Sequence, residues 1–126
     1  MVNVAEIKDS SRQAPTPTTW RPVFKDIARA LAEGDYQLQS CVTAVKHLQE
    51  SSALFIQQSI RNYGARLTLL SDDTWQTSVC IWTGKHWDVL IDLWTEEEGP
   101  SDLVLSAQVF ESHVGFVYEV QMVYVP

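Results

Sequence analysis

The spacing of apolar residues in the first half of the chain predicts helices. In the first stretch they recur at the i, i+3, i+4 and i+7 positions that share one helical face: Trp20, Val23, Phe24, Ile27 and Leu31. Thr18 or Thr19 is a suitable N-cap, Pro22 is tolerated in a first turn, and Gly34 is suited to end the helix. We therefore expect a first helix from about residue 20 to residue 33.

Two more stretches, 37–49 and 51–63, carry a similar apolar stripe. Ser51 or Ser52 can cap the second of them, and Gly64 can close it. The periodicity nearly continues through the two serines, so residues 37–63 form either two helices or one bent helix.

After Gly64 the period changes from about 3.6 to 2, which is typical of strands. Residues 66–70 read as a short strand, and residues 74–83 pair with 86–95 across a Gly84-Lys85 turn. This register places three pairs opposite one another: Trp82 and Trp87, Cys80 and Val89, and Trp75 and Trp94. One face of the hairpin is apolar throughout, whereas the other combines Trp75 and Trp94 with Asp88 and Asp92.

A second hairpin joins residues 102–111 to 116–125 over a loop at 112–115. Pairing the strands with this loop length sets apolar residues against apolar ones, with Ala107 opposite Val120 and Leu105 opposite Met122. A slip of one residue would set apolar against polar positions along the whole hairpin.

Helices followed by strands indicate an α+β domain. We expect about three N-terminal helices packed on one face of a curved antiparallel sheet of about five strands. Residues 1–19 form an N-terminal arm or linker, because 10–19 is polar and contains Pro15 and Pro17. Residues 20–126 form a single domain.

Charge is divided unevenly along the 126 residues, whose net charge is −7. Residues 1–66 contain eight basic and six acidic residues, whereas residues 67–126 contain only Lys85 against ten acids, a net −9. This balance argues against nucleic-acid binding and favours a basic partner for the second half. The alternative is an acidic surface that serves solubility.

Catalytic and metal-binding patterns are weak. His47, His86 and His113 have no nucleophile motif nearby, and the run Glu96–Glu98 with Asp102 lacks the spacing of a calcium loop. We expect no enzyme activity, no cofactor and no metal. Cys41 and Cys80 lie in apolar contexts typical of reduced, buried thiols, and no signal peptide or membrane span is expected, which favours the cytoplasm.

The hairpin face with two tryptophans and two carboxylates, and the acidic connection after it, are the candidate partner-binding site. Aromatic anchors beside charged groups are common in tight protein interfaces. The alternatives are a core role for the tryptophans and a solvated connection for the acids. The candidate residues are Trp75, Asp88, Asp92, Trp94, Glu96, Glu97 and Glu98.

Four segments together resemble a family of small bacterial domains: ALAEGDY at 30–36, IRNYG at 60–64, DLWTEEEGPSDLVL at 92–105 and VYVP at 123–126. The most specific is the W-T-x-E-E-G-x-S-D-L motif that begins at Trp94. More loosely, the size, acidity and order of elements resemble immunity proteins of polymorphic toxin and contact-dependent inhibition systems, some of which have cystatin-like or NTF2-like folds. That resemblance implies a protein that binds a toxin.

Two functional hypotheses follow. The first is a bacterial immunity protein that uses an acidic surface to occlude the basic active-site cleft of a cognate toxin, which we expect to be a nuclease. The alternative is an NTF2-like ligand-binding domain or small enzyme with a pocket between helices and sheet. Under the immunity hypothesis we expect a protein partner and no binding of nucleic acid or membrane. The sequence does not determine the oligomeric state.

Overall fold

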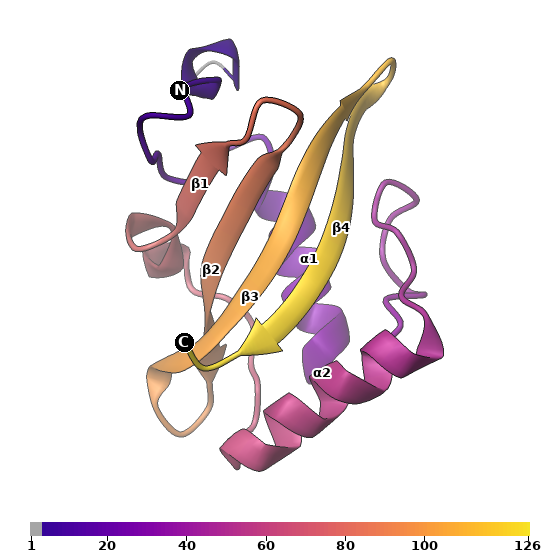
Figure 1. Ribbon diagram of the computed structural model, residues 1–126. Helices are drawn as coiled ribbons and strands as arrows, with labels where there is room; N and C mark the ends of the chain where they lie inside the picture. The colour runs from indigo at the N-terminus through magenta and orange to yellow at the C-terminus, as the bar shows by residue number, and fades with distance from the viewer. Residues whose placement is uncertain (1–3) are drawn as a thin grey trace.

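The computed structural model describes residues 4–126 and shows an α+β fold with two α-helices and a four-stranded antiparallel sheet (Figure 1). The strands follow one another in the order β1-β2-β3-β4. The elements are η1 (Val4–Ile7), α1 (Arg21–Ala32), α2 (Glu50–Tyr63), η2 (Asp72–Gln76), β1 (Val79–Trp82), β2 (Trp87–Thr95), β3 (Gly99–Ser112) and β4 (Gly115–Tyr124). The expectation of three helices and five strands was therefore too high by one of each.

The first predicted helix is confirmed as α1. Its apolar stripe is buried at Phe24, Ile27 and Leu31, and proline occupies the first turn. Trp20 takes the N-cap position, and no side chain caps the helix there. Gly34 has a φ of +87°, a left-handed conformation that glycine adopts without strain and that ends the helix.

The predicted helix at residues 37–49 is wrong, because tertiary contacts replace its helical hydrogen bonds. Leu38 has a φ of +61° and is fully buried, and the Asp35 carboxylate accepts hydrogen bonds from the N–H groups of Gln39 and Ser40. Farther along, Val45 forms a parallel bridge with Tyr118 of β4. Residues 33–49 are thus a loop that closes on the sheet, and only the second of the two stretches forms a helix, α2.

The hairpin between β1 and β2 has the predicted register over its inner half. Trp82 lies opposite Trp87, and Cys80 lies opposite Val89. Trp75 does not lie opposite Trp94, because residues 72–76 form the short helix η2 instead of extending β1. Thr74 ties this short helix to β2, because its hydroxyl donates a 2.7 Å hydrogen bond to the Asp92 carbonyl and its side chain is buried.

The hairpin between β3 and β4 follows the prediction as far as Ala107 and Val120 and then departs from it. A bulge follows, and Ser106 pairs with Met122 while Leu105 pairs with Val123. One extra residue in β4 therefore reverses the expected faces beyond this point. Val123 is fully buried, and Met122 is 43% exposed.

The expected strand at residues 66–70 is reduced to a single bridge between Leu67 and Thr95. The Thr68 N–H donates to the Trp94 carbonyl at 2.9 Å, and the Glu96 N–H donates to the Arg66 carbonyl at 2.9 Å. This segment is tied to the end of β2 without adding a full strand to the sheet.

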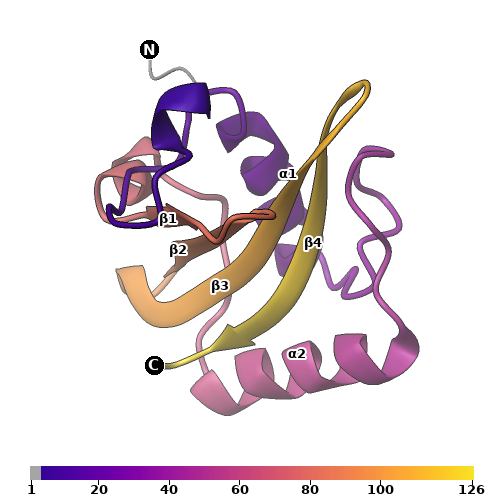
Figure 2. The same cartoon turned by 45° about the horizontal axis from the view of Figure 1, so that its top comes forward.

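Helix α1 covers one face of the sheet, and α2 lies along the side of β4 (Figures 1 and 2). Large aromatic side chains fill the layer between α1 and the sheet, with Trp20 against Trp87 at 5.1 Å between ring centroids and Phe24 against Tyr118 at 5.6 Å. Edge-to-face pairs at such distances add to the stabilisation from apolar burial.

The described part of the N-terminal arm packs on the same side as α1. The Trp87 indole N–H donates to the Ile7 carbonyl at 3.2 Å, and Ile7 is buried. Ala14 and Cys80 exchange two backbone hydrogen bonds at the free edge of β1. The arm therefore leaves the opposite face of the sheet uncovered.

Candidate functional site

The sheet face that points away from α1, called here the open face, has no helix packed across it among residues 4–126 (Figure 1). Side chains of a strand alternate between faces, so the pairing of the strands identifies its members. They are Val79, Ile81, Asp88, Leu90, Asp92, Trp94, Val104, Ser106, Gln108, Phe110, Val117, Glu119, Met122 and Tyr124.

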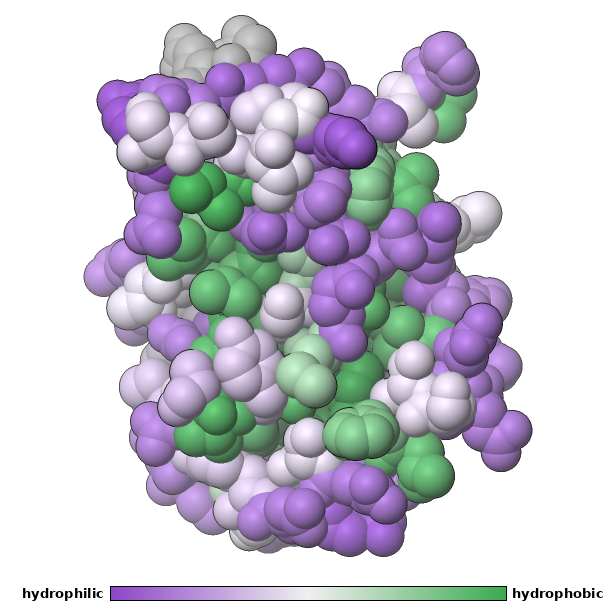
Figure 3. Space-filling view, viewed as in Figure 1, coloured by the Kyte–Doolittle hydropathy of each residue, from purple (hydrophilic) through white to green (hydrophobic). Residues whose placement is uncertain are grey.

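Apolar residues form the centre of the open face. Leu90 and Met122 are 38% and 43% exposed, and they lie in one row across the strands because both pair with Ser106. Figure 3 shows hydrophobic side chains over the middle of this face and hydrophilic ones toward its upper and lower rims. An exposed apolar surface with a polar rim is typical of a protein interaction site.

Three carboxylates lie among these apolar residues. The Asp88 carboxylate lies 3.0 Å from the His86 imidazole, and the Asp92 carboxylate accepts a 2.6 Å hydrogen bond from the Thr77 hydroxyl. The Glu119 carboxylate forms an ion pair with Lys46 at 3.7 Å. Asp88 and Glu119 both pair with Gln108, so two strand spacings, about 10 Å, separate their backbones. Asp88 and Asp92 are four residues apart on β2, about 13 Å.

Basic residues are missing from all four strands. The strands contain Asp88, Asp92, Asp102, Glu111 and Glu119 but no lysine or arginine. The basic residues of α1 lie on the other side of the sheet, where Lys25 pairs with Asp72 and Arg29 pairs with Asp26 and Glu33. The open face is therefore an acidic surface without basic residues on its own strands, and Lys46, from the loop beside β4, compensates one of its carboxylates.

The structure places the seven candidate residues in three different environments. Asp88, Asp92 and Trp94 share the open face, as the alternation in β2 predicted. Trp75 is only 4% exposed and lies under the Arg21 guanidinium, 5.5 Å from the ring centroid. It is a core residue that is not part of the open face.

The acidic connection Glu96–Glu98 is engaged within the protein. The Glu97 carboxylate accepts the Arg66 N–H at 2.9 Å, and the Glu96 carboxylate lies 3.4 Å from the Arg66 guanidinium. Glu98 accepts hydrogen bonds from the Tyr63 hydroxyl at 2.7 Å and from the Thr95 hydroxyl at 3.2 Å. These contacts hold the β2–β3 turn against the end of α2.

The W-T-x-E-E-G-x-S-D-L motif is accounted for by this contact. The Ser101 hydroxyl donates to the Leu93 carbonyl at 2.6 Å, and the Asp102 N–H donates to the Tyr63 hydroxyl at 3.1 Å. Gly99 has a φ of +77°, and a Cβ there would lie 3.5 Å from the Trp94 ring. The motif and the Tyr63-Gly64 helix end, far apart in sequence, therefore form one structural contact.

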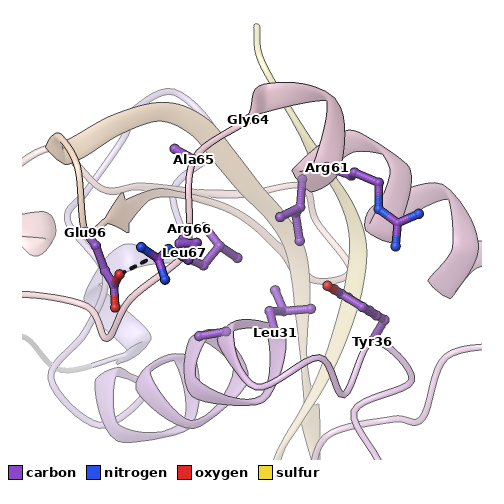
Figure 4. Close-up of a pocket in the computed structure, with 10 residues that line it drawn as sticks. Leu31, Tyr36, Arg61, Gly64, Ala65, Arg66, Leu67 and Glu96 are labelled. Carbon is purple, nitrogen blue, oxygen red and sulfur yellow. Dashed lines mark ion pairs between the residues drawn. The ribbon is translucent and has the colours of Figure 1, made fainter.

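A pocket of about 400 Å³ lies between the C-terminal ends of α1 and α2 (Figure 4). Its lining combines apolar residues such as Leu31 and Ile60 with charged ones, and the Arg66 side chain is directed toward Glu96. Arg61 lies in the last turn of α2, where a positive charge stabilises the helix dipole. The lining residues are Leu31, Ala32, Tyr36, Ile60, Arg61, Gly64, Ala65, Arg66, Leu67 and Glu96.

Both cysteine thiols and one tyrosine hydroxyl have raised pKa values. Burial raises the pKa of the Cys80 thiol to about 11, and burial followed by the nearby Asp26 carboxylate raises the pKa of Cys41 to about 11. Burial likewise raises the pKa of Tyr118 to about 12. Because the thiolate is the reactive form of cysteine, neither thiol is activated for catalysis at neutral pH.

Within residues 4–126, no group of three or more His, Cys, Asp or Glu side chains is placed to hold a metal ion. No helix of that part of the chain has the length and apolar character needed to cross a membrane.

Residues 28–126 match the model of the family described as a domain of unknown function, DUF7668. The chain belongs to this family. No curated protein and no solved structure matches the chain. The match includes the end of α2 that contacts the β2–β3 turn, and the whole sheet, so the open face lies inside the family domain.

Glu119 is the member of the acidic surface that our candidate set lacked. Its place on the outward side of β4 follows from the alternation in the second hairpin, which was available in the sequence. The place of Met122 on the open face could not be predicted from this alternation, because the bulge beside it moves it from the expected core face to the open face.

Proposed function

We propose that the protein is a bacterial immunity protein that acts in the cytoplasm and neutralises a cognate toxin, a nuclease, by covering its active site with the open face. The observation that carries the proposal is an uncovered sheet face with three carboxylates and no basic residue on its strands. A nuclease cleft is basic because it holds phosphates, so carboxylates in a fixed array can take the place of those phosphates. Charge complementarity of this kind raises association rates and selects the partner.

The residues of this proposal are Asp88, Asp92 and Glu119, with Leu90 and Met122 between them. The carboxylates supply steering and specificity, and the apolar residues supply burial when water leaves the interface. Glu97 and Glu98 act indirectly, because their hydrogen bonds hold the turn that connects β2 and β3.

The ligand-binding alternative requires a cavity between helix and sheet. Trp20, Phe24 and Trp87 are each fully buried in that layer, so large side chains occupy the space that an NTF2-like pocket would need.

Co-expression of the product of the neighbouring gene with this protein tests the proposal. The wild-type protein is expected to restore growth and to co-purify with that product. The triple variant Asp88→Asn, Asp92→Asn, Glu119→Gln is expected to lose protection, whereas Glu33→Gln, which removes an exposed charge beside α1, is expected to keep it. Full protection by the triple variant would refute the acidic-surface proposal.

A further inference from the structure

A groove runs between α2 and the last part of β4, at the margin of the open face. One part of it has a volume of about 400 Å³ and is lined by Ser51, Ser52, Phe55, Ile56, Ser59, Gln121, Met122 and Val123. A second hollow shares Ser59 and continues along α2 past Tyr63 to Tyr124. Since Met122 and Tyr124 belong to the open face, this α2–β4 groove and the open face form one continuous surface.

The helix side of the groove combines Ile56, which belongs to the protein's own core, with residues that the fold leaves exposed. The residues of α2 that are buried against the domain are Ala53, Ile56 and Ile60. Phe55 is 66% exposed at the groove, a large apolar side chain that the fold itself does not cover. The serines at 51, 52 and 59 are short, and the space above them gives the groove its depth.

We propose that the α2–β4 groove is the socket for a bulky apolar side chain, presented by the partner between basic residues. The identity of that partner rests on the function proposed above, whereas the chemistry of the socket does not. Met122 has a flexible thioether side chain that can adapt to the shape of an aromatic or aliphatic anchor. Interfaces commonly combine one such buried anchor with a charged surround.

Charge identifies the flanking chemistry. The groove is lined by neutral side chains, and Glu119, which pairs with Lys46 at 3.7 Å, precedes its β4 wall by only two residues. Two strands farther across the sheet, β2 carries Asp88 and Asp92, and none of the four strands contains a lysine or an arginine. A second copy of this chain would set these carboxylates against each other, so the occupant is a basic partner and not another copy.

Methionine methyl signals report occupation of the groove directly, because the chain has two methionines, Met1 and Met122. The probe is a short peptide with lysines on both sides of a central tryptophan, and its matched control has alanine at the centre. In methyl-labelled protein, the tryptophan peptide is expected to shift the Met122 signal by its ring current. It should also bind about tenfold more tightly than the alanine peptide, because burial of about 55 Å² of the indole, roughly a quarter of its surface, corresponds to this factor.

Phe55→Ala is expected to abolish the advantage of the tryptophan peptide. Leu54→Ala is the matched control, because Leu54 is 53% exposed on the same helix but does not line the groove. An unmoved Met122 signal, equal affinities for the two peptides, or equal effects of the two alanine variants would overturn the proposal. If the triple amide variant still protects cells while the Met122 shift persists, the acidic-surface proposal fails and the socket stands. If the wild-type protein does not protect cells while the Met122 shift persists, the immunity proposal fails and the socket stands.

Discussion

Val123 and Met122 are neighbours in β4, and the bulge predicts opposite consequences for their truncation. Val123 is fully buried, so Val123→Ala removes the equivalent of two methylene groups from the core and leaves a cavity, a cost of about 2–3 kcal/mol. Met122 is 43% exposed, so Met122→Ala is expected to cost less than about 1 kcal/mol. For a domain of this size, 1 kcal/mol corresponds to a shift of about 4 °C in Tm.

Urea unfolding monitored by tryptophan fluorescence measures both free energies, since the chain has five tryptophans. In a regular hairpin without the bulge, Met122 would pair with Leu105 in the core, and Met122→Ala would cost about 2–5 kcal/mol. A larger loss of stability for Met122→Ala than for Val123→Ala would therefore refute the register described here.

Deletion of Gln121 tests the same feature from the other side. Gln121 is exposed, and its side chain bonds to Gln108 at 3.3 Å across the strands. Removing it restores a regular strand and leaves Val123 in the core, so stability should stay within about 1 kcal/mol of wild type. Deletion of Glu119, which shifts Val120 toward the open face, is the control and should destabilise the protein more strongly.

Three further predictions concern the loop, the arm and the thiols. Burial raises the pKa of Asp35, but hydrogen bonds from Ser40 and Gln39 outweigh it and lower the folded-state pKa below the ordinary 3.8. The stabilisation that Asp35 contributes is therefore present above pH 3.8 and is lost as pH falls through the folded-state pKa. Asp35→Asn should cost about 1 kcal/mol at neutral pH and flatten this acid dependence in urea titrations; an unchanged acid limb would contradict the assignment. Ser78→Ala leaves the buried Thr16 N–H without its 3.1 Å acceptor and should cost about 1–3 kcal/mol by thermal unfolding, whereas no loss would show that the arm is not docked. The Cys80 thiol should react with a disulfide reagent far more slowly at pH 8 in the folded protein than in urea, and equal rates would argue against its burial.

The parts of the fold that the sequence predicted correctly depend on local periodicity. Helix α1, helix α2 and the pairing of Trp82 with Trp87 all follow from apolar spacing and from glycine at the element ends. Two members of the candidate surface, Asp88 and Asp92, were found in the same way, because alternation along one strand places them on one face.

The parts that could not be predicted depend on contacts between distant segments. Residues 37–49 have a helical pattern, but the bridge of Val45 to Tyr118 across the fold determines their path. The bulge in β4 inserts one residue that parity cannot detect. Glu98 looked available for a partner, and its hydrogen bond to Tyr63 joins residues 35 positions apart.

The placement of the partner on the open face is the central claim, and carboxyl footprinting of the purified complex tests it most directly. A carbodiimide and an amine label exposed Asp and Glu side chains, and mass spectrometry locates the labels in the free protein and in the complex. We expect labelling of Asp88, Asp92 and Glu119 to fall on complex formation while labelling of Glu33 stays unchanged. Protection of Glu33 with continued labelling of the three open-face carboxylates would contradict the account.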